Sequence, residues 1–187
     1  MRSSVKKRDT KVLNLENDIA NLEKWFDGRK FVLERVYRGS EDGFTAAGFR
    51  PKVHMKDNIL IVAESDSGKK FGGYTSLVLL DGFAANGYYS DKQAFIFSLT
   101  HQTKHKLNQG KEANSIYYGP GYLILFGDGH DIYLNNNCNT GNNTANLGAA
   151  YEAPPGIAYN TDPSKSYLGG AVNFKIKEIE AFQVKFY

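Results

Sequence analysis

Apolar residues recur at helical spacing near the start of the chain and fall into short runs after it. The helical set consists of Leu15, Ile19, Leu22 and Phe26. Residues three or four positions apart lie on one face of an α-helix, so this set predicts an amphipathic helix over residues 15–27. Asn14 is suited to cap its first turn, and Gly28 lies where a helix of this length would end.

Short apolar runs separated by turn residues dominate the rest of the chain. They cover residues 31–37, 58–63, 70–80, 94–99, 122–126 and 131–134. The segment 65–68, Ser-Asp-Ser-Gly, predicts a hairpin turn between the second and third runs, and 127–129, Gly-Asp-Gly, predicts a tight turn between the last two. Many short strands joined by such turns predict a β-rich (α+β) fold in which two antiparallel sheets pack as a sandwich.

The end of the chain predicts one long strand over residues 173–187, because apolar residues there alternate with lysine and glutamine. The alternation slips at Glu178 and Glu180, which share the parity of the apolar residues on either side. Two explanations remain open. One is a β-bulge or a break into two strands near Glu178. The other is a pair of carboxylates kept on an exposed groove.

Two polar segments have little to bury. Residues 1–12 carry five basic residues and one acidic residue, which predicts a solvated, disordered tail, with contact to a membrane or nucleic acid as the alternative. Between 135 and 146, seven of twelve positions are Asn, which predicts a mobile surface loop. Cys138 lies in this loop and is therefore expected to be exposed and open to oxidation. The globular domain is expected over residues 13–187.

Charge and cysteine content narrow the class of protein. The 23 basic and 20 acidic residues give a net charge of +3 and are spread along the chain, so no strong field would attract nucleic acid. The single cysteine cannot form an internal disulfide, which fits a cytoplasmic setting. No stretch approaches the roughly 20 apolar residues of a membrane span, so we expect no membrane insertion.

Residue types that catalyse reactions or bind metals occur, but not in patterns that assemble a site. His101 and His105 would share one face of a helix, as a metal site requires, yet the lysines beside His105 oppose a cation. Asp128, His130 and Asp131 could form an acid–base cluster, but they lie in a predicted turn, where Asp and Gly serve the backbone. We therefore expect no metal, no cofactor and no catalytic residue.

An ordered series of short motifs runs through the chain. In sequence order these are 37–44 (Tyr-Arg-x-Ser-x-Asp-Gly-Phe), 71–76 (Phe-Gly-Gly-Tyr-Thr-Ser), 95–99 (Phe-Ile-Phe-Ser-Leu), 118–120 (Tyr-Gly-Pro), 126–127 (Phe-Gly), 131–133 (Asp-Ile-Tyr), 147–148 (Leu-Gly) with Tyr151, 167–170 (Tyr-Leu-Gly-Gly) and 174–182 (Phe-x-Ile-x-Glu-Ile-Glu-x-Phe). Each motif is short, but their order and spacing resemble the TLDc domain. The resemblance covers about residues 13–187.

This resemblance implies a fold and a function. The implied fold is a two-sheet antiparallel sandwich with flanking helices, in which twelve motif residues have structural roles: Phe71, Gly72, Gly73, Tyr74, Gly119, Pro120, Gly127, Asp131, Gly148, Tyr151, Leu168 and Gly169. TLDc proteins are associated with binding the vacuolar proton-pumping ATPase and with protection against oxidative stress, and no settled catalytic residues belong to the domain. The resemblance therefore implies a protein partner such as subunits of this ATPase, which would recruit the chain from the cytoplasm to organelle membranes.

Three functions remain open from the sequence. The resemblance favours a non-catalytic protein-interaction module that regulates the proton pump. The alternatives are an unrecognised enzyme or redox-active protein using Glu178, His130 or Cys138, and a structural adaptor in a larger assembly. Contacts with a partner are expected from charged positions without an evident core role, including a basic loop over 104–111. These positions are Asp42, Gly43, Lys104, Lys106, Lys111, Glu178 and Glu180.

Overall fold

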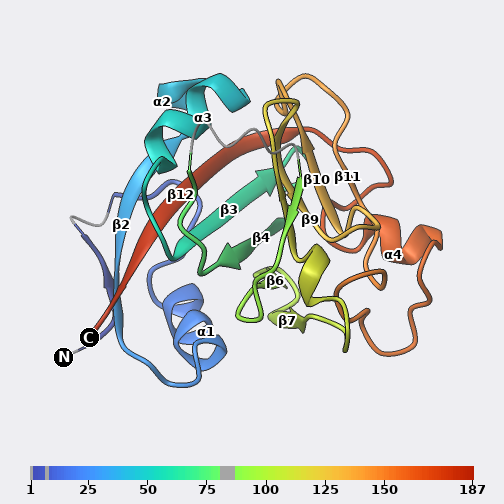
Figure 1. Cartoon of the computed structure of the whole chain (residues 1–187), viewed down its shortest axis with the longest axis horizontal. Coiled ribbons are helices and arrows are strands. Elements are labelled where there is room, and N and C mark those ends of the chain that lie inside the picture. Colours follow the sequence, from blue (N-terminus) through green and yellow to red (C-terminus); the bar gives the residue numbers. More distant parts are fainter. Residues whose placement is uncertain (1, 7–8, 81–86) are drawn as a thin grey trace.

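The computed structural model describes residues 2–6, 9–80 and 87–187, which form two sheets (Figure 1). The seven-stranded sheet has the order β1 (Ser4–Val5), β2 (Phe31–Arg38), β12 (Ile176–Phe186), β3 (Ile59–Ser65), β4 (Lys70–Thr75), β6 (Phe95–Ser98) and β7 (Thr103–Lys106). The five-stranded sheet has the order β11 (Thr144–Ala145), β10 (Ile132–Asn135), β9 (Tyr122–Phe126), β8 (Ile116–Tyr118) and β5 (Gly87–Tyr89). The helices described are α1 (Asn17–Trp25), α2 (Gly39–Asp42), α3 (Ala46–Val53), the 3₁₀ helix η2 (Glu112–Asn114) and α4 (Asp162–Ser166). Apart from the parallel pair β1–β2, neighbouring strands are antiparallel, so the predicted sandwich with flanking helices is confirmed.

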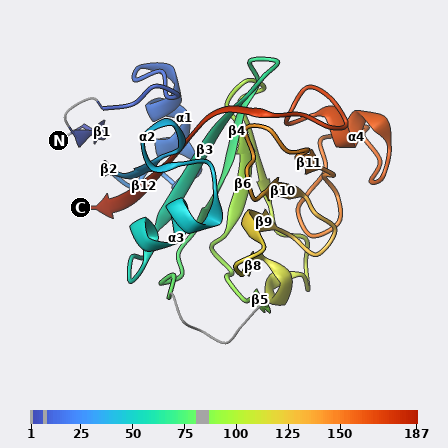
Figure 2. The ribbon, with the colours of Figure 1, turned by 90° about the horizontal axis from the view of Figure 1, so that it is seen from above.

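The fold has three layers, with the seven-stranded sheet in the middle (Figure 2). One apolar core lies between the sheets, where Ile61 and Phe71 of the larger sheet share a cluster with Phe126 of the smaller one. A second core lies on the other face of the larger sheet, where Leu22 and Trp25 of α1 belong to the same cluster as strand residues. Both faces of the central strands are therefore buried, which removes the simple alternation of apolar and polar residues.

Helix α1 confirms the predicted amphipathic helix, although it is two residues shorter at each end than the predicted span 15–27. The Asn14 side-chain oxygen accepts hydrogen bonds from two backbone amides of the first turn. Gly28 has a φ of 79° and its amide donates to the Glu23 carbonyl at 2.9 Å, which closes the helix. The buried face of α1 packs on the central sheet, and the helix end lies at the rim of the cavity described below.

The hairpin β3–β4 is confirmed, with its turn at the predicted segment 65–68. Strand β4, however, ends at Thr75 instead of continuing to residue 80. The hydroxyls of Thr75 and Ser76 and the Ser76 amide donate to the Asp91 carboxylate at 2.7 Å. These bonds fix a turn after the strand, a long-range constraint that the local sequence does not carry.

Strand β12 crosses the whole molecule and pairs with both β2 and β3 (Figure 1). Its register against β3 shifts between Ile176 and Glu178, so the predicted bulge near Glu178 is confirmed. The alternative, a carboxylate pair in an exposed groove, is wrong because Glu178 is 7% exposed and Glu180 is 0% exposed. Ile179 faces the core between the sheets, whereas Phe182 belongs to the core under α1. The strand thus supplies apolar residues to both cores, and this explains the slip in its pattern.

The described part of the N-terminal basic segment packs against the sheet and does not form the predicted disordered tail. Strand β1 pairs with β2, and Val12 is fully buried. The Glu180 carboxylate accepts from the Thr10 hydroxyl at 2.6 Å, the Lys11 amide at 3.0 Å and the Arg38 guanidinium at 2.7 Å. A buried carboxylate requires such donors. Thr10 and Lys11 supply two of them, and we call the contact of residues 9–12 with Glu180 the N-terminal clasp.

The Asn-rich segment is also ordered, and it is not the predicted mobile surface loop. Asn143 is fully buried, and its side-chain amide donates to the carbonyls of Cys138 at 2.7 Å and Phe174 at 2.9 Å. The segment contributes strand β11, and Cys138 is 0% exposed. The predicted exposure of Cys138 is therefore wrong, and burial raises the pKa of its thiol to about 12, which disfavours the thiolate. Asparagine is used here as a partner for backbone groups.

None of the helices in the described parts of the chain is long and apolar enough to cross a membrane.

Candidate functional site: a cationic cavity beside helix α1

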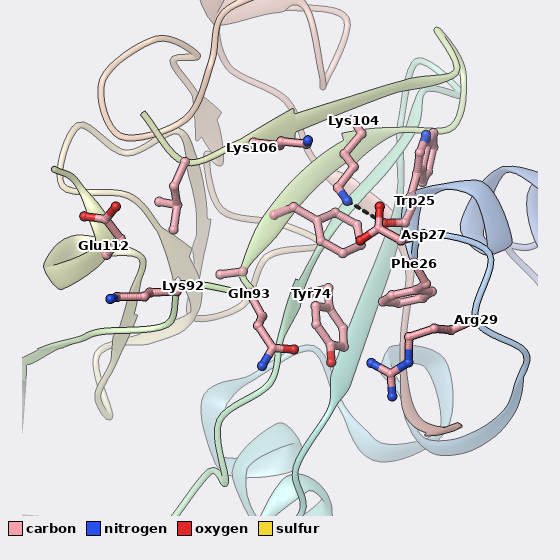
Figure 3. A pocket seen from close by; sticks show the side chains of 13 residues that line it. Trp25, Phe26, Asp27, Arg29, Tyr74, Lys92, Gln93, Lys104, Lys106 and Glu112 are labelled. Atoms are coloured by element: carbon pink, nitrogen blue, oxygen red, sulfur yellow. Dashed lines mark hydrogen bonds between the residues drawn. The ribbon is translucent and has the colours of Figure 1, made fainter. Parts of the chain in front are cut away.

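A cavity of about 450 Å³ opens between the end of α1 and strands β4, β6 and β7 (Figure 3). Four cationic side chains line it: Arg29, Lys92, Lys104 and Lys106. Two acidic residues, Asp27 and Glu112, also line it, so the cavity carries more positive than negative groups. Lys92 and Glu112 lie on one side, and Asp27 and Arg29 lie on the other. We call this site the cationic cavity.

The floor of the cationic cavity is aromatic and tightly packed. Trp25, Phe26, Tyr74 and Phe95 are each at most 6% exposed. Phe26 meets Tyr74 edge to face with ring centroids 4.9 Å apart, and Tyr74 stacks on Phe95 at 5.3 Å. Such contacts restrain the rings. The packed rings therefore form a rigid floor beneath the cationic groups.

Strand β7 places two of the predicted partner-binding lysines in this cavity. Lys104 and Lys106 are two residues apart, so both point to the same face of the strand. The Lys104 ammonium donates to the Trp25 carbonyl at the end of α1 and lies 4.5 Å from the centre of the Phe95 ring. Burial lowers the pKa of Lys104. Lys104 therefore anchors α1 to the sheet, whereas Lys106 is exposed and can meet a ligand.

Arg29 and Lys92 complete the exposed cationic rim. The Arg29 guanidinium lies 3.6 Å from the centre of the Phe186 ring, and this contact restricts the position of the charged group. Lys92 is exposed on the segment before β6. These groups can attract and orient carboxylates or other anions, and such attraction between exposed charges weakens as salt increases. The sequence did not indicate either residue, because they lie 63 positions apart and join only through the fold.

The prediction of a basic loop over 104–111 is wrong, because residues 104–106 belong to strand β7. The lysines of this segment also do not lie together. Lys111 does not line the cavity; its ammonium pairs with Asp128 at 3.0 Å. The two candidates in the 42–43 turn have structural contacts. Asp42 accepts from the Arg38 amide at 3.0 Å and pairs with Lys52 at 2.7 Å. The Gly43 carbonyl accepts from the Tyr37 hydroxyl at 2.7 Å.

Glu178 and Glu180 are not available as surface contacts. The Glu178 carboxylate accepts from the Ser40 amide at 3.0 Å and from the Ser40 hydroxyl at 2.5 Å. Glu180 holds the N-terminal clasp and pairs with Arg38. The structure therefore moves both residues from the predicted partner surface into the framework of the fold.

The histidines also have structural partners. His105 lies on β7, not on a helix, and its two ring nitrogens lie 2.9 Å from the Thr103 hydroxyl and 2.9 Å from the Glu152 carbonyl. Burial lowers the pKa of His105, which favours the neutral ring. His101 stacks on Tyr167 with ring centroids 4.5 Å apart. Across the described ranges, no group of three or more His, Cys, Asp or Glu residues is arranged to hold a metal ion.

Asp128, His130 and Asp131 do not share one site. Asp131 is buried and accepts hydrogen bonds from four successive backbone amides, at 148–151. Burial raises the pKa of Asp131 to about 6, and the four amides oppose that rise. Asp128 instead binds Lys111 and Asn114, while the His130 ring stacks on Tyr133. Asp131 thus holds the 148–151 backbone in place.

The motif residues lie mostly in the packed framework. A β-carbon on Gly72 would lie 1.9 Å from the Ile61 carbonyl oxygen, and one on Gly73 would lie 2.5 Å from the Phe126 ring. Gly127 and Gly169 leave similarly little space, and Gly148 has a φ of 116°. Of the larger motif residues, the buried ones are Phe71, Tyr74, Asp131, Tyr151 and Leu168. Gly119 and Pro120 connect β8 to β9.

The described chain is therefore a two-sheet antiparallel sandwich with an amphipathic helix on its outer face and a cationic cavity at the end of that helix. The family model described as the TLDc domain matches residues 7–185, and the chain belongs to the TLDc family. A search of curated proteins finds no significant match.

Proposed function

We propose that this TLDc domain is a non-catalytic protein-interaction module whose partner is the vacuolar proton-pumping ATPase. Family membership supports the proposal, because TLDc proteins are associated with this pump and with protection against oxidative stress. The structural observation that carries it is the cationic cavity, which presents Arg29, Lys92 and Lys106 above a packed aromatic floor. The domain acts from the cytoplasm and reaches organelle membranes through this partner.

The cavity favours an acidic surface on the pump. Exposed charges at the rim of an interface chiefly accelerate association and select partners of opposite sign. The rigid floor adds to this, because little conformational entropy is lost when a surface is already ordered before binding. A stable interface buries about 1,200–2,000 Å² in total, more than the cavity alone provides, so neighbouring loops contribute the remainder.

The alternative of a redox-active protein depended mainly on Cys138. Its side chain is buried and the pKa of its thiol is raised to about 12, which argues against this alternative. Glu178 is likewise engaged by Ser40. The adaptor alternative differs from the proposal only in the partner, so a direct binding experiment separates them.

The test titrates the purified domain into purified vacuolar ATPase and measures both binding and ATP hydrolysis. We expect association at micromolar concentration or below and a change in hydrolysis or assembly. Lys106→Glu should slow association by about tenfold, because it reverses a charge on the cavity rim. Lys175→Glu is the matched control, since it makes the same charge change at an exposed site outside the cavity. No association at micromolar concentration would contradict the proposal and favour the adaptor.

A further inference from the structure

One hydroxyl group lies at the centre of the N-terminal clasp. The Thr10 hydroxyl donates to the Glu180 carboxylate at 2.6 Å. The same oxygen accepts from the backbone amides of Val12 at 3.2 Å and Leu13 at 3.0 Å, which shapes the turn that follows. Thr10 is partly exposed, whereas Glu180 is fully buried. This hydroxyl group therefore joins a segment at the surface to a buried charge.

The arginines of the clasp already have carboxylate partners. Arg38 donates to Glu180 at 2.7 Å and to Asp9 at 2.8 Å. Arg35 donates to the other Asp9 oxygen at 2.6 Å. Both arginines also donate to Glu41, at 2.5 Å and 2.9 Å. A further negative group beside Thr10 would have to compete with carboxylates that are already bound.

The sequence before Thr10 is basic. Four of the five basic residues in segment 1–12 precede it, and two of these stand at the second and third positions before it. Protein kinases select their substrates partly by charge pattern. Basic residues immediately before an acceptor hydroxyl suit the acidic substrate groove of a basophilic serine/threonine kinase, because opposite charges attract. The basic run thus precedes the one hydroxyl on which the clasp depends.

We propose that Thr10 is a phosphorylation site and that its modification opens the N-terminal clasp. A basophilic kinase transfers the phosphoryl group from ATP. The Thr10 oxygen bonds to the γ-phosphorus while the bond from that phosphorus to the oxygen bridging the β-phosphate breaks. ADP leaves, and the hydroxyl proton passes to the catalytic aspartate of the kinase. The inference is independent of which partner binds at the cationic cavity.

Phosphorylation removes a hydrogen-bond donor and adds charge of the wrong sign. A phosphate ester carries about −1.5 to −2 charges at pH 7, and it replaces the hydroxyl that donates to Glu180. Repulsion from Glu180 is strong because this carboxylate is 0% exposed and is screened little by solvent. Lys11, the cation next in sequence, already pairs with Glu178 at 3.7 Å. The repulsion therefore favours a state in which residues 9–12 leave the sheet.

Opening of the clasp uncovers apolar surface beside α1. Val12 is 0% exposed and Leu13 is 7% exposed, and both belong to the core on that side of the larger sheet. The Lys70 ammonium donates to the Val12 carbonyl at 2.6 Å, and this bond is lost when the segment leaves. Residues 9–12 then become the solvated segment that their composition predicts.

The closed clasp also controls access to Thr10. A kinase binds its acceptor in an extended segment, whereas the Thr10 hydroxyl is engaged by Glu180 and by the turn. The segment must therefore open locally before the phosphoryl group is transferred. Contacts that hold the clasp closed, such as Arg35 with Asp9, should slow the modification.

The test incubates the whole domain with ATP and the catalytic subunit of the cyclic-AMP-dependent protein kinase, which is basophilic. Tandem mass spectrometry locates the phosphate, which we expect on Thr10 and not in Thr10→Ala. Hydrogen exchange then compares the modified and unmodified domains. Protection in residues 9–13 should fall by about tenfold or more on modification, while β3 and β4 stay unchanged.

Variants separate charge from the lost hydrogen bond and test the control of access. Thr10→Val removes the donor without adding charge, so it should lower protection in 9–13 less than phosphorylation does. Thr10→Ser keeps the hydroxyl and should be modified and opened like the unmodified domain. Arg35→Gln loses the contact with Asp9 and should raise the initial rate of phosphorylation several-fold. Lys177→Gln is the matched control, because it removes one positive charge from an exposed pair with Glu64 and should leave the rate unchanged.

Three results would overturn the proposal. The first is no phosphate on Thr10, even in Arg35→Gln. The second is phosphate on Thr10 with equal or greater protection in residues 9–13, which would show that the arginines accept the phosphate within a closed clasp. The third is an equal rate of phosphorylation in Arg35→Gln, Lys177→Gln and the unaltered domain, which would show that the clasp does not control access.

Discussion

Strands β12 and β7 each carry two charged residues that the sequence marked as partner contacts, and the fold treats them in opposite ways. On β12, Glu180 is fully buried and holds the N-terminal clasp, and Glu178 binds Ser40. On β7, Lys104 anchors α1, and Lys106 remains exposed in the cationic cavity. The difference comes from position in the sheet. Strand β12 lies inside the larger sheet with a strand on each side, whereas β7 is its last strand. Charged residues that look alike in the sequence are therefore buried in the framework on β12, whereas on β7 one of the two, Lys106, stays exposed.

The largest effect should come from removing a buried charge on β12. Glu180→Ala leaves the Arg38 guanidinium, 6% exposed, without its nearest buried partner. Breaking a buried ion pair in this way costs about 3–5 kcal/mol. Chemical denaturation should show this loss in the free energy of unfolding. Lys177→Ala is the control, because it breaks an exposed pair with Glu64 and should change stability by less than about 1 kcal/mol. Equal stability of the two variants would mean that Glu180 is not part of the framework.

A second prediction concerns the buried thiol in the Asn-rich segment. Cys138→Ser places a hydroxyl in an apolar site and should cost about 1–3 kcal/mol in the free energy of unfolding. Cys138→Ala, which adds no polar group, should cost less. The thiol should also react slowly with a maleimide in the native protein and quickly after denaturation. Rapid labelling of the native protein would show that the segment opens.

Acid should loosen the N-terminal clasp. Hydrogen bonds from Arg35 and Arg38 lower the pKa of Asp9 below its ordinary value of 3.8, and the same arginines lower that of Glu41. A lowered pKa in the folded state means that the contribution to stability is present above the unfolded pKa and is lost as pH falls through the folded pKa. Amide protection factors in residues 9–12, which correct for the intrinsic pH dependence of exchange, should therefore fall below about pH 4. In Arg35→Gln this step should be smaller; an equal step would show that other groups cause it.

Much of the fold could be predicted from the sequence, because the signals involved are local. The period of α1, the turn of the β3–β4 hairpin and the run that forms β9 all reflect neighbouring residues. The order of the motifs also identified the family. The errors involve partners far away in the chain. The sequence around Glu180 suggests a surface charge, but in the structure residues 9–12 cover this carboxylate. The sequence around Asn143 suggests a mobile loop, but its side-chain amide donates a hydrogen bond to the Phe174 carbonyl.

The candidate site could be predicted only in part for the same reason. Lys104 and Lys106 stood out as a basic cluster, but their separate roles depend on the Trp25 carbonyl at the end of α1. Arg29 and Lys92 carry no signal until α1 and the segment before β6 come together.

The smallest effect on stability should come from the exposed lysine on β7. Lys106→Glu should change the free energy of unfolding by no more than about 0.5 kcal/mol, because the residue is exposed and lies at the edge of the sheet. Thermal melting beside Lys175→Glu provides the measurement. A much larger loss would place Lys106 in the framework with Glu180 and remove the contrast between the two strands.

The measurement that tests the central claim most directly is the rate of association between the domain and purified vacuolar ATPase as salt is raised. Opposite charges that meet across a cavity rim are screened over about 10 Å at 0.1 M salt. The rate for the unmodified domain and for Lys175→Glu should therefore fall steeply with salt. Lys106→Glu should associate more slowly at low salt and depend less on salt, with little change in the dissociation rate. Identical rates and salt dependence for all three proteins, or no association at all, would contradict a pump-binding role for the cationic cavity.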